Sequence, residues 1–175
     1  IMRLGLIGCG EITRFMALLA KVNRKIHIVG CADIDLEKAR KFASYFKGAQ
    51  AYDNFQEMLS NLEVDAVYLA VPHYLHYPIM RELIEGGVSI LCEKPVATNL
   101  EDAVQIVELA RAHQVKVGIN YQYRYDKACY RMATAARSGD LGQLYYGICN
   151  VPWHRTDKYF SQSKWHSSLE QAGGG

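Results

Sequence analysis

Met2–Thr13 reads MRLGLIGCGEIT, and this stretch decides the fold. A short apolar run ends at Gly8, and Gly8-Cys9-Gly10 leads directly into the segment Glu11–Val22. In that segment apolar residues recur at positions i, i+3, i+4 and i+7, the spacing of one face of an α-helix. They are Ile12, Phe15, Met16 and Leu19. A strand, a glycine turn and a helix in this order predict the start of a βαβ unit.

The same alternation continues along the chain. Further strands are predicted at Ile26–Ala32, Ala49–Tyr52, Asp65–Val71, Val88–Cys92 and Val115–Ile119. Four further helices are predicted between these strands. One follows the cap residue Asp35, one spans Phe55–Asn61, one begins near Pro78, and one follows the capping box Thr98-x-x-Glu101. Apolar strands alternating with amphipathic helices predict an α/β fold with a parallel sheet covered on both faces. Such a series fits a doubly wound Rossmann sheet of strand order 3-2-1-4-5-6.

The pattern changes after about Tyr125. A helix is predicted at Lys127–Ser138, then a turn at Gly139–Gly142 and a strand at Gln143–Val151. We therefore expect a nucleotide-binding domain over residues 1–122 and the beginning of a substrate and oligomerisation domain, of α+β type, over residues 123–175.

Composition and charge are those of an ordinary globular protein. Half of the 175 residues are hydrophobic and 22% are charged, and 20 Lys+Arg against 18 Asp+Glu leave a net charge of +2. This balance excludes disorder and argues against a nucleic-acid binder, which normally carries a basic face. Apolar runs such as Ala66–Pro72 fall short of the ~20 residues of a membrane span, and we expect no signal peptide. Five cysteines without a CxxC pair predict reduced, buried side chains in a cytoplasmic protein.

The glycine turn has the form of a dinucleotide fingerprint. The first glycine, Gly8, would make the tight turn, and the second, Gly10, would let the backbone approach a pyrophosphate at the helix N-terminus. Thr13 replaces the third glycine, which normally permits close packing of helix on strand. Methyltransferases also have a glycine loop here, so the turn alone leaves both classes open.

Asp33 gives a second sign. It ends the predicted second strand, where a carboxylate can accept hydrogen bonds from the adenosine ribose and repels a 2′-phosphate. NAD is therefore predicted over NADP. Lys38 could reach a phosphate, although a solvated helix face is the simpler interpretation. Asp33 could also be a plain helix cap, but Asp35 is better placed for that role.

Polar residues also follow the fourth and fifth strands. Pro72-His73 and His76 follow one, and Glu93-Lys94-Pro95 follows the other, beside the switch point where open α/β sheets bind ligands. A lysine there can assist the deprotonation of a substrate hydroxyl if burial or a nearby cation lowers its pKa. The alternative is a surface ion pair with Glu93. His73 and His76 have a spacing that metal ligands could use, but no third partner lies nearby, so no metal is expected.

The sixth strand and the late region hold the candidate substrate residues. Alternation along a strand would place Tyr121, Tyr123 and Tyr125 on one face and Asn120, Gln122 and Arg124 on the other. Trp153, Arg155 and Trp165 are accompanied by His154, Tyr159 and His166, a mixture that suits stacking on a sugar or cyclitol. Ordinary packing explains such aromatics equally well.

Together these motifs resemble the Gfo/Idh/MocA family of NAD(P)-dependent oxidoreductases. The resemblance rests on Gly8-x-Gly10, Asp33, Pro72…His76, the segment from Gly118 to Tyr125, the terminal glycine run and, above all, Glu93-Lys94-Pro95. It implies that Lys94 is catalytic and that the Lys94–Pro95 peptide bond is cis. The candidate cofactor-binding residues are Gly8, Gly10, Glu11, Ile12, Asp33, Ile34, Lys38, Ala70, Val71, Pro72, His73, His76, Glu93, Lys94 and Gln122. The candidate substrate residues are Tyr123, Arg124, Trp153, Arg155 and Trp165.

The resemblance implies hydride transfer between nicotinamide and a hydroxyl of a sugar, nucleotide sugar or inositol. The second acid/base residue of the family is expected beyond Gly175, so this fragment alone is expected to be inactive. The full-length protein is expected to be a homo-oligomer. The exact substrate and the reaction direction stay open. Two alternatives also stay open: a non-catalytic NAD-binding sensor or subunit, and a related amino-acid or tetrapyrrole reductase.

Overall fold

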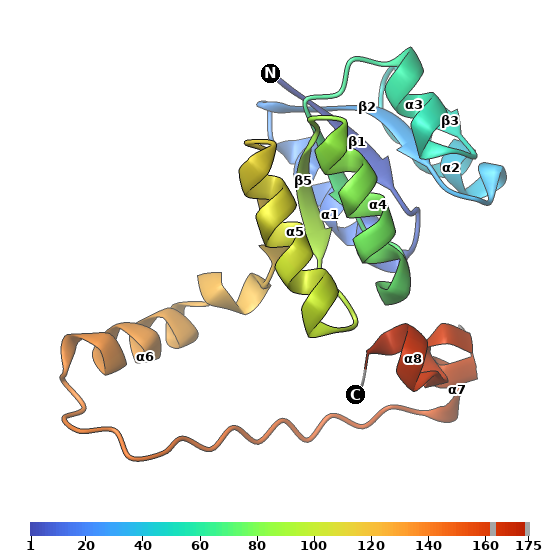
Figure 1. Cartoon of the computed structure of the whole chain (residues 1–175). Coiled ribbons are helices and arrows are strands. Elements are labelled where there is room, and N and C mark those ends of the chain that lie inside the picture. Colours follow the sequence, from blue (N-terminus) through green and yellow to red (C-terminus); the bar gives the residue numbers. More distant parts are fainter. Residues whose placement is uncertain (162–163, 174–175) are drawn as a thin grey trace. The chain divides into compact units, whose positions relative to one another are not determined.

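A six-stranded parallel sheet forms the centre of the N-terminal part of the chain (Figure 1). The computed structural model describes residues 1–161 and 164–173. The strands are β1 (Met2–Ile7), β2 (Ile26–Ala32), β3 (Gln50–Tyr52), β4 (Ala66–Leu69), β5 (Ser89–Glu93) and β6 (Val117–Asn120). Their order in the sheet is β3-β2-β1-β4-β5-β6, which confirms the predicted doubly wound topology.

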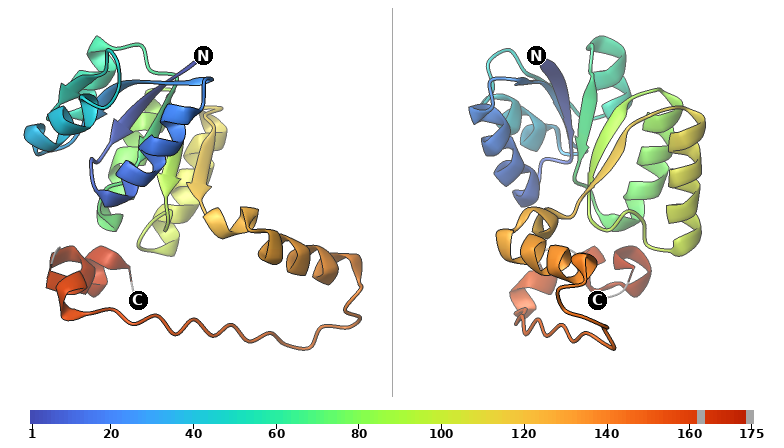
Figure 2. Two further views of the ribbon diagram at one scale, coloured as in Figure 1. Left: turned by 180° about the vertical axis from the view of Figure 1, so that it is seen from behind. Right: turned by 90° about the vertical axis from the view of Figure 1, so that its left-hand side faces the viewer.

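Helices cover the sheet from both sides (Figure 2). On one face lie α1 (Glu11–Val22) and α2 (Leu36–Ala43), and on the other lie α3 (Phe55–Asn61), α4 (His76–Glu85) and α5 (Leu100–Ala112). Each face has its own apolar core, because successive strand residues point to opposite sides. Tyr68 packs in the core beneath α1 and α2, whereas its neighbours Val67 and Leu69 pack in the core beneath α4 and α5.

Helix α1 has the predicted bounds, but most of its large apolar residues do not face the sheet; Met16 is partly buried against the core. Thr13, Ala17 and Ala20 are its buried residues, whereas Phe15 is 70% exposed. Small side chains let a helix approach a sheet closely, and this approach turns the opposite, apolar side of the helix outward. The stripe predicted from the periodicity is thus real, but Ile12, Phe15 and Leu19 are exposed on it.

Three local predictions are wrong. Asn99, not Thr98, caps α5: its Oδ1 accepts a hydrogen bond from the N–H of Asp102 at 2.8 Å, and its side-chain amide donates to the Asp102 carboxylate at 2.7 Å. Strand β6 ends at Asn120, and the chain turns into a short 3₁₀ helix, η2 (Gln122–Tyr125), so the side chains do not alternate there. Gln143–Val151 is not a strand, because no described segment pairs with it.

Contacts divide the chain into two units. One comprises Ile1–Asn120 and the residues from Trp165 onward, and the other comprises Tyr121–Lys164. The second unit contains α6 (Lys127–Ser138), which has the predicted bounds and is capped by Asp126, and α7 (Asp157–Ser161). The late residues Lys164–Ser167 form the 3₁₀ helix η3, and Leu169–Ala172 form α8. The assignment of residues 123–175 to a substrate domain stays a prediction.

The burial of the cysteines agrees with the prediction only in part. Cys9, Cys31 and Cys92 are buried as predicted, whereas Cys129 is only partly buried and Cys149 is exposed. None of the helices in the described residues is both long and apolar enough to cross a membrane.

Candidate active site

Gly8 makes the turn between β1 and α1. Its φ is +88°, a conformation that side-chain-bearing residues rarely adopt, and its N–H donates to the carbonyl oxygen of Ala32 at 2.9 Å. A Cβ at this position would lie 2.2 Å from the carbonyl oxygen of Ala70. Glycine is therefore required here by the close approach of the loop that follows β4.

Gly10 has different surroundings from Gly8. A Cβ on Gly10 would meet no atom within 4 Å, so nothing in the chain itself demands glycine. No side chain caps the first turn of α1, whereas Asp35, Asn54 and Asn99 cap α2, α3 and α5. The open space over Gly10 and the uncapped N–H groups at the positive end of the helix dipole fit the pyrophosphate of a dinucleotide.

Thr13 explains the missing third glycine. Its side chain is fully buried, and its hydroxyl donates to the carbonyl oxygen of Gly8 at 2.5 Å. The hydroxyl thereby satisfies its own hydrogen bond inside the core and ties α1 to the turn that precedes it. The close packing that a third glycine normally permits is thus reached with a small polar residue.

Asp33 is fixed against the glycine turn. Its Oδ2 accepts from the N–H of Cys9 at 2.7 Å, and its Oδ1 accepts from the N–H of Asp35 at 2.9 Å. The helix cap is Asp35, as predicted, and Asp35 also forms a salt bridge of 3.4 Å with Lys38. Ile34, beside this carboxylate, is 98% exposed. The carboxylate therefore belongs to the glycine turn, and its remaining lone pairs can accept hydrogen bonds from a ligand.

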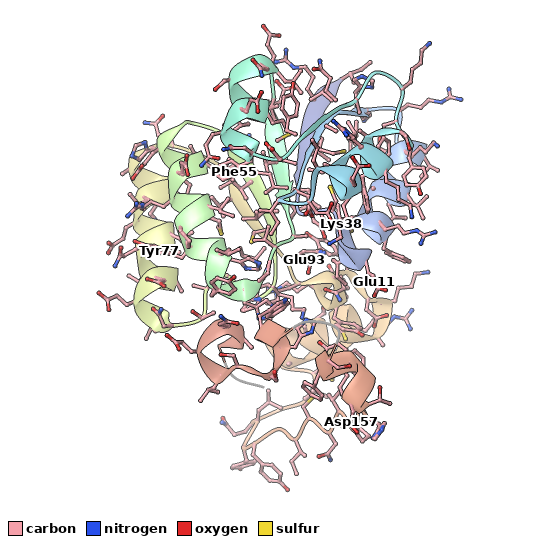
Figure 3. The ribbon with its side chains drawn as sticks, turned by 90° about the vertical axis from the view of Figure 1, so that its right-hand side faces the viewer. Glu11, Lys38, Phe55, Tyr77, Glu93 and Asp157 are labelled. Atoms are coloured by element: carbon pink, nitrogen blue, oxygen red, sulfur yellow. The ribbon has the colours of Figure 1, made fainter. Side chains whose placement is uncertain are left out.

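Glu93 ends β5 and is held from both neighbouring strands. The hydroxyl of Tyr68 on β4 and the amide of Asn120 on β6 each donate to Glu93 Oε1 at 2.6 Å. Burial, followed by the hydrogen bond to Glu93, raises the pKa of Tyr68, which keeps its hydroxyl a donor. Glu93, Lys38 and Glu11 lie toward the same end of the sheet (Figure 3). The two hydrogen bonds to Oε1 hold the Glu93 carboxylate in one position, where it can act as a hydrogen-bond acceptor.

Sequence reasoning missed Tyr68 and Asn120. Asn120 pairs with Glu93 in the parallel register of β5 and β6, but that register was not predicted. Tyr68 lies in an otherwise apolar strand, where it reads as a core residue. The signal that could have identified both is a polar side chain next to Glu93 on each adjacent strand.

Lys94 follows Glu93 at the end of the sheet. Its peptide bond to Pro95 is cis, as the resemblance implies. The Lys94 side chain is exposed. Its positive charge contributes to lowering the pKa of His73 and of His76.

His76 does not present its ring nitrogens to solvent. The side chain is fully buried, Nδ1 lies 2.6 Å from the carbonyl oxygen of Pro95, and Nε2 lies 3.0 Å from that of Val71. Burial lowers the pKa of His76, whereas the two carbonyls and Glu93 oppose this shift. Both ring nitrogens of His76 are thus engaged by the two loops, and the cofactor contact expected from the resemblance stays a prediction.

His73 contacts the returning end of the chain. It lies in the 3₁₀ helix η1 (His73–Leu75), and its Nδ1 is 2.9 Å from the carbonyl oxygen of Ala172. The ring of Trp165 packs edge-on against it, with centroids 4.5 Å apart. Burial lowers the pKa of His73. Trp165, predicted as a substrate residue, thus lies at the same end of the sheet as the loop after β4.

The other predicted substrate residues belong to the unit Tyr121–Lys164. Tyr123 and Arg124 are exposed in η2, as is Gln122, which was predicted to bind the cofactor. The Arg155 guanidinium stacks on Trp153 and Tyr159, 4.7 and 5.0 Å from the ring centroids. Stacking of this kind holds the guanidinium in place and leaves its edge N–H groups able to bind an anion. In the part of the chain described, no group of three or more His, Cys, Asp or Glu residues could hold a metal ion.

The sheet topology and the glycine turn define a Rossmann-fold dinucleotide-binding protein. A family model described as an oxidoreductase family with an NAD-binding Rossmann fold matches residues 2–121. The chain belongs to this family, the Gfo/Idh/MocA oxidoreductases.

Similar proteins are dehydrogenases and oxidoreductases. An uncharacterized oxidoreductase of Synechocystis is 30% identical over 95% of this chain and 44% of its own length, and inositol 2-dehydrogenase of Corynebacterium glutamicum is 29% identical over 82% and 43%. The WlbA dehydrogenase of Bordetella pertussis, solved with NADH and UDP-GlcNAcA, is 27% identical with a TM-score of 0.91 over 97% of this chain and 53% of its own. The chain spans about half the length of these relatives.

Proposed function

We propose that the complete protein is an NAD-dependent dehydrogenase that transfers hydride between nicotinamide and a hydroxyl-bearing carbon of a sugar-type substrate. The observation that carries this proposal is the meeting of Gly8, Asp33 and Glu93 at the carboxyl ends of β1, β2 and β5, where open α/β sheets bind ligands. When bound, the nicotinamide ring supplies the hydride acceptor or donor. In this scheme Glu93 accepts a hydrogen bond from the nicotinamide ribose, and Lys94 hydrogen-bonds the reacting hydroxyl and assists its deprotonation.

The preference for NAD over NADP belongs to the same proposal. Asp33 supports it, because its carboxylate is held by two backbone N–H groups beside the turn and would repel a 2′-phosphate. Lys38 is paired with Asp35, so it is already engaged in a surface ion pair. The exposed side chain of Ile34 offers an apolar contact for the adenine ring.

The preference can be tested with Asp33→Asn. The amide keeps an acceptor for the loop but removes the charge, so we expect the Kd for NADH to rise and that for NADPH to fall. One charged hydrogen bond stabilises by about 1.5–3 kcal/mol, so the Kd ratio should shift by about tenfold or more. Binding is measured by NADH and NADPH fluorescence titration. Asp35→Asn, which alters the neighbouring cap, should leave the ratio unchanged; an unchanged ratio in Asp33→Asn would contradict the assignment.

For the substrate, the proposal favours a nucleotide-linked sugar over inositol. WlbA, which was solved with UDP-GlcNAcA, matches 97% of the chain at 27% identity. The stacked Arg155 adds a group suited to a phosphate or carboxylate. The test is NADH formation by the complete protein with UDP-GlcNAcA, with UDP-GlcNAc and with myo-inositol. NADH binding without turnover on any of them would favour a non-catalytic binding protein.

We further propose that the complete protein is a cytoplasmic homo-oligomer. The resemblance supports the oligomer, and the five free cysteines suit a reducing compartment. Light scattering of the complete protein would give its mass in solution, and a monomer would contradict the first part. Cell fractionation would test the second.

A further inference from the structure

The buried ring of His76 bridges two loops that leave neighbouring strands. One loop follows β4 at Val71–Pro72, and the other follows β5 at Lys94–Pro95. His76 itself stands at the start of α4, one residue after η1, and its ring lies between the two loops with one nitrogen on each. Three elements therefore meet at a single side chain that reaches no solvent.

The sheet cannot hold these loops together. The register of β4 with β5 ends at the pair Leu69 and Cys92, before either loop begins. On the other side of Lys94, Glu93 is fixed by Tyr68 and Asn120. Beyond the sheet, the His76 ring is the polar contact that joins the two loops among the described residues: the imidazolium donates to both carbonyls, and the neutral ring donates to one of them.

We propose that His76 is a positioning residue. It fixes the Lys94–Pro95 loop to the Val71–Pro72 loop and thereby holds the backbone of Lys94 at the place where its side chain can reach the nicotinamide end of the cofactor. The inference rests on the proposed function for its kinetic consequence, but not for the link itself. Lys94 has a long flexible side chain, so its position depends on its backbone, which Glu93 holds on one side and Pro95 on the other. Small displacements of a catalytic group cost large factors in rate.

Three variants separate the contacts. His76→Leu fills the space but removes the N–H that the ring donates to these carbonyls. In His76→Asn the amide nitrogen can replace Nδ1 and donate to Pro95, whereas in His76→Gln, which is longer, it can replace Nε2 and donate to Val71. Met80→Ala is the matched control, because Met80 is fully buried one turn further along α4 and belongs to the apolar core.

The first measurement needs no activity. Hydrogen exchange of the 175-residue chain, read by mass spectrometry, should become about tenfold faster in both loops in His76→Leu, which corresponds to the loss of about one net hydrogen bond. His76→Asn should protect the Lys94–Pro95 loop, and His76→Gln should protect the Val71–Pro72 loop. Met80→Ala should lower Tm without a selective effect on the loops. Unchanged exchange of both loops in His76→Leu would overturn the proposal.

The second measurement uses the complete protein. His76→Leu should lower kcat about 100-fold per NADH-binding site, while the Kd for NADH changes far less. In His76→Asn, kcat should be higher than in His76→Leu. A merely structural role would lower Tm in parallel with Met80→Ala and leave kcat per folded site near that of the parent. If exchange rises as expected but the parent has no dehydrogenase activity, the proposed function fails and the loop link stands.

Discussion

Replacement of Lys94 by methionine should remove turnover and leave NADH binding intact. Methionine keeps an unbranched apolar stem but has no group that can donate to the substrate hydroxyl or take its proton. General acid–base groups contribute about 10²–10⁴-fold to a rate, so we expect kcat to fall by about 10³-fold. Binding should persist because the glycine turn and Asp33 lie on other strands, and because Lys94 is exposed and supports no core.

The measurement is steady-state NADH formation by the complete protein, combined with NADH titration of the same preparation. Lys47→Met serves as the control, since Lys47 is also an exposed lysine but follows α2, on a different strand crossover. If Lys94→Met retained kcat close to that of the parent, Lys94 would not be the catalytic residue. If Lys94→Met lost NADH binding as well, Lys94 would contribute to cofactor binding in addition to the glycine turn and Asp33.

The arrangement of the sheet was predictable because each strand carries its own signal. A strand is apolar where both of its faces are buried, as residues 28–32 of β2 are, and right-handed crossovers leave few orders for such strands. The orientation of α1 was not predictable from periodicity. Its apolar stripe and its small-residue face are both regular, and only the close approach of helix to sheet selects the face of Thr13 and Ala17.

The candidate site was predictable where the chain order alone places a residue. Gly8, Asp33 and Glu93 each end a strand, so a parallel sheet brings them to one edge. The supports of these residues depend on register and on long-range contacts. Tyr68 reaches Glu93 across the sheet, and Ala172 returns to His73 from a distant part of the sequence. No local spacing records such contacts, and for the same reason the bridge that His76 makes between the two loops was not predicted.

Gly8→Ala should have the largest effect on stability. The new Cβ would lie 2.2 Å from the Ala70 carbonyl oxygen and 2.8 Å from its carbon, so both obstacles are backbone and neither can rotate away. The positive φ of 88° adds a conformational cost of about 1–3 kcal/mol. The clash also forces β1 away from the loop after β4. We therefore expect Gly8→Ala to lower the free energy of unfolding by more than about 4 kcal/mol, a large part of the ~5–15 kcal/mol of a typical domain.

Two other glycines separate the causes of this loss. Gly48 also has a positive φ, +81°, but its Cβ would meet no atom within 4 Å, so Gly48→Ala should cost only the conformational term, about 1 kcal/mol. Gly10→Ala should leave unfolding unchanged and weaken NADH binding, because its Cβ would fill the open space over the first turn of α1. Urea unfolding and NADH titration of the three variants give both quantities. Equal losses of stability at Gly8 and Gly48 would contradict the steric account, and full NADH affinity in Gly10→Ala would place the pyrophosphate elsewhere.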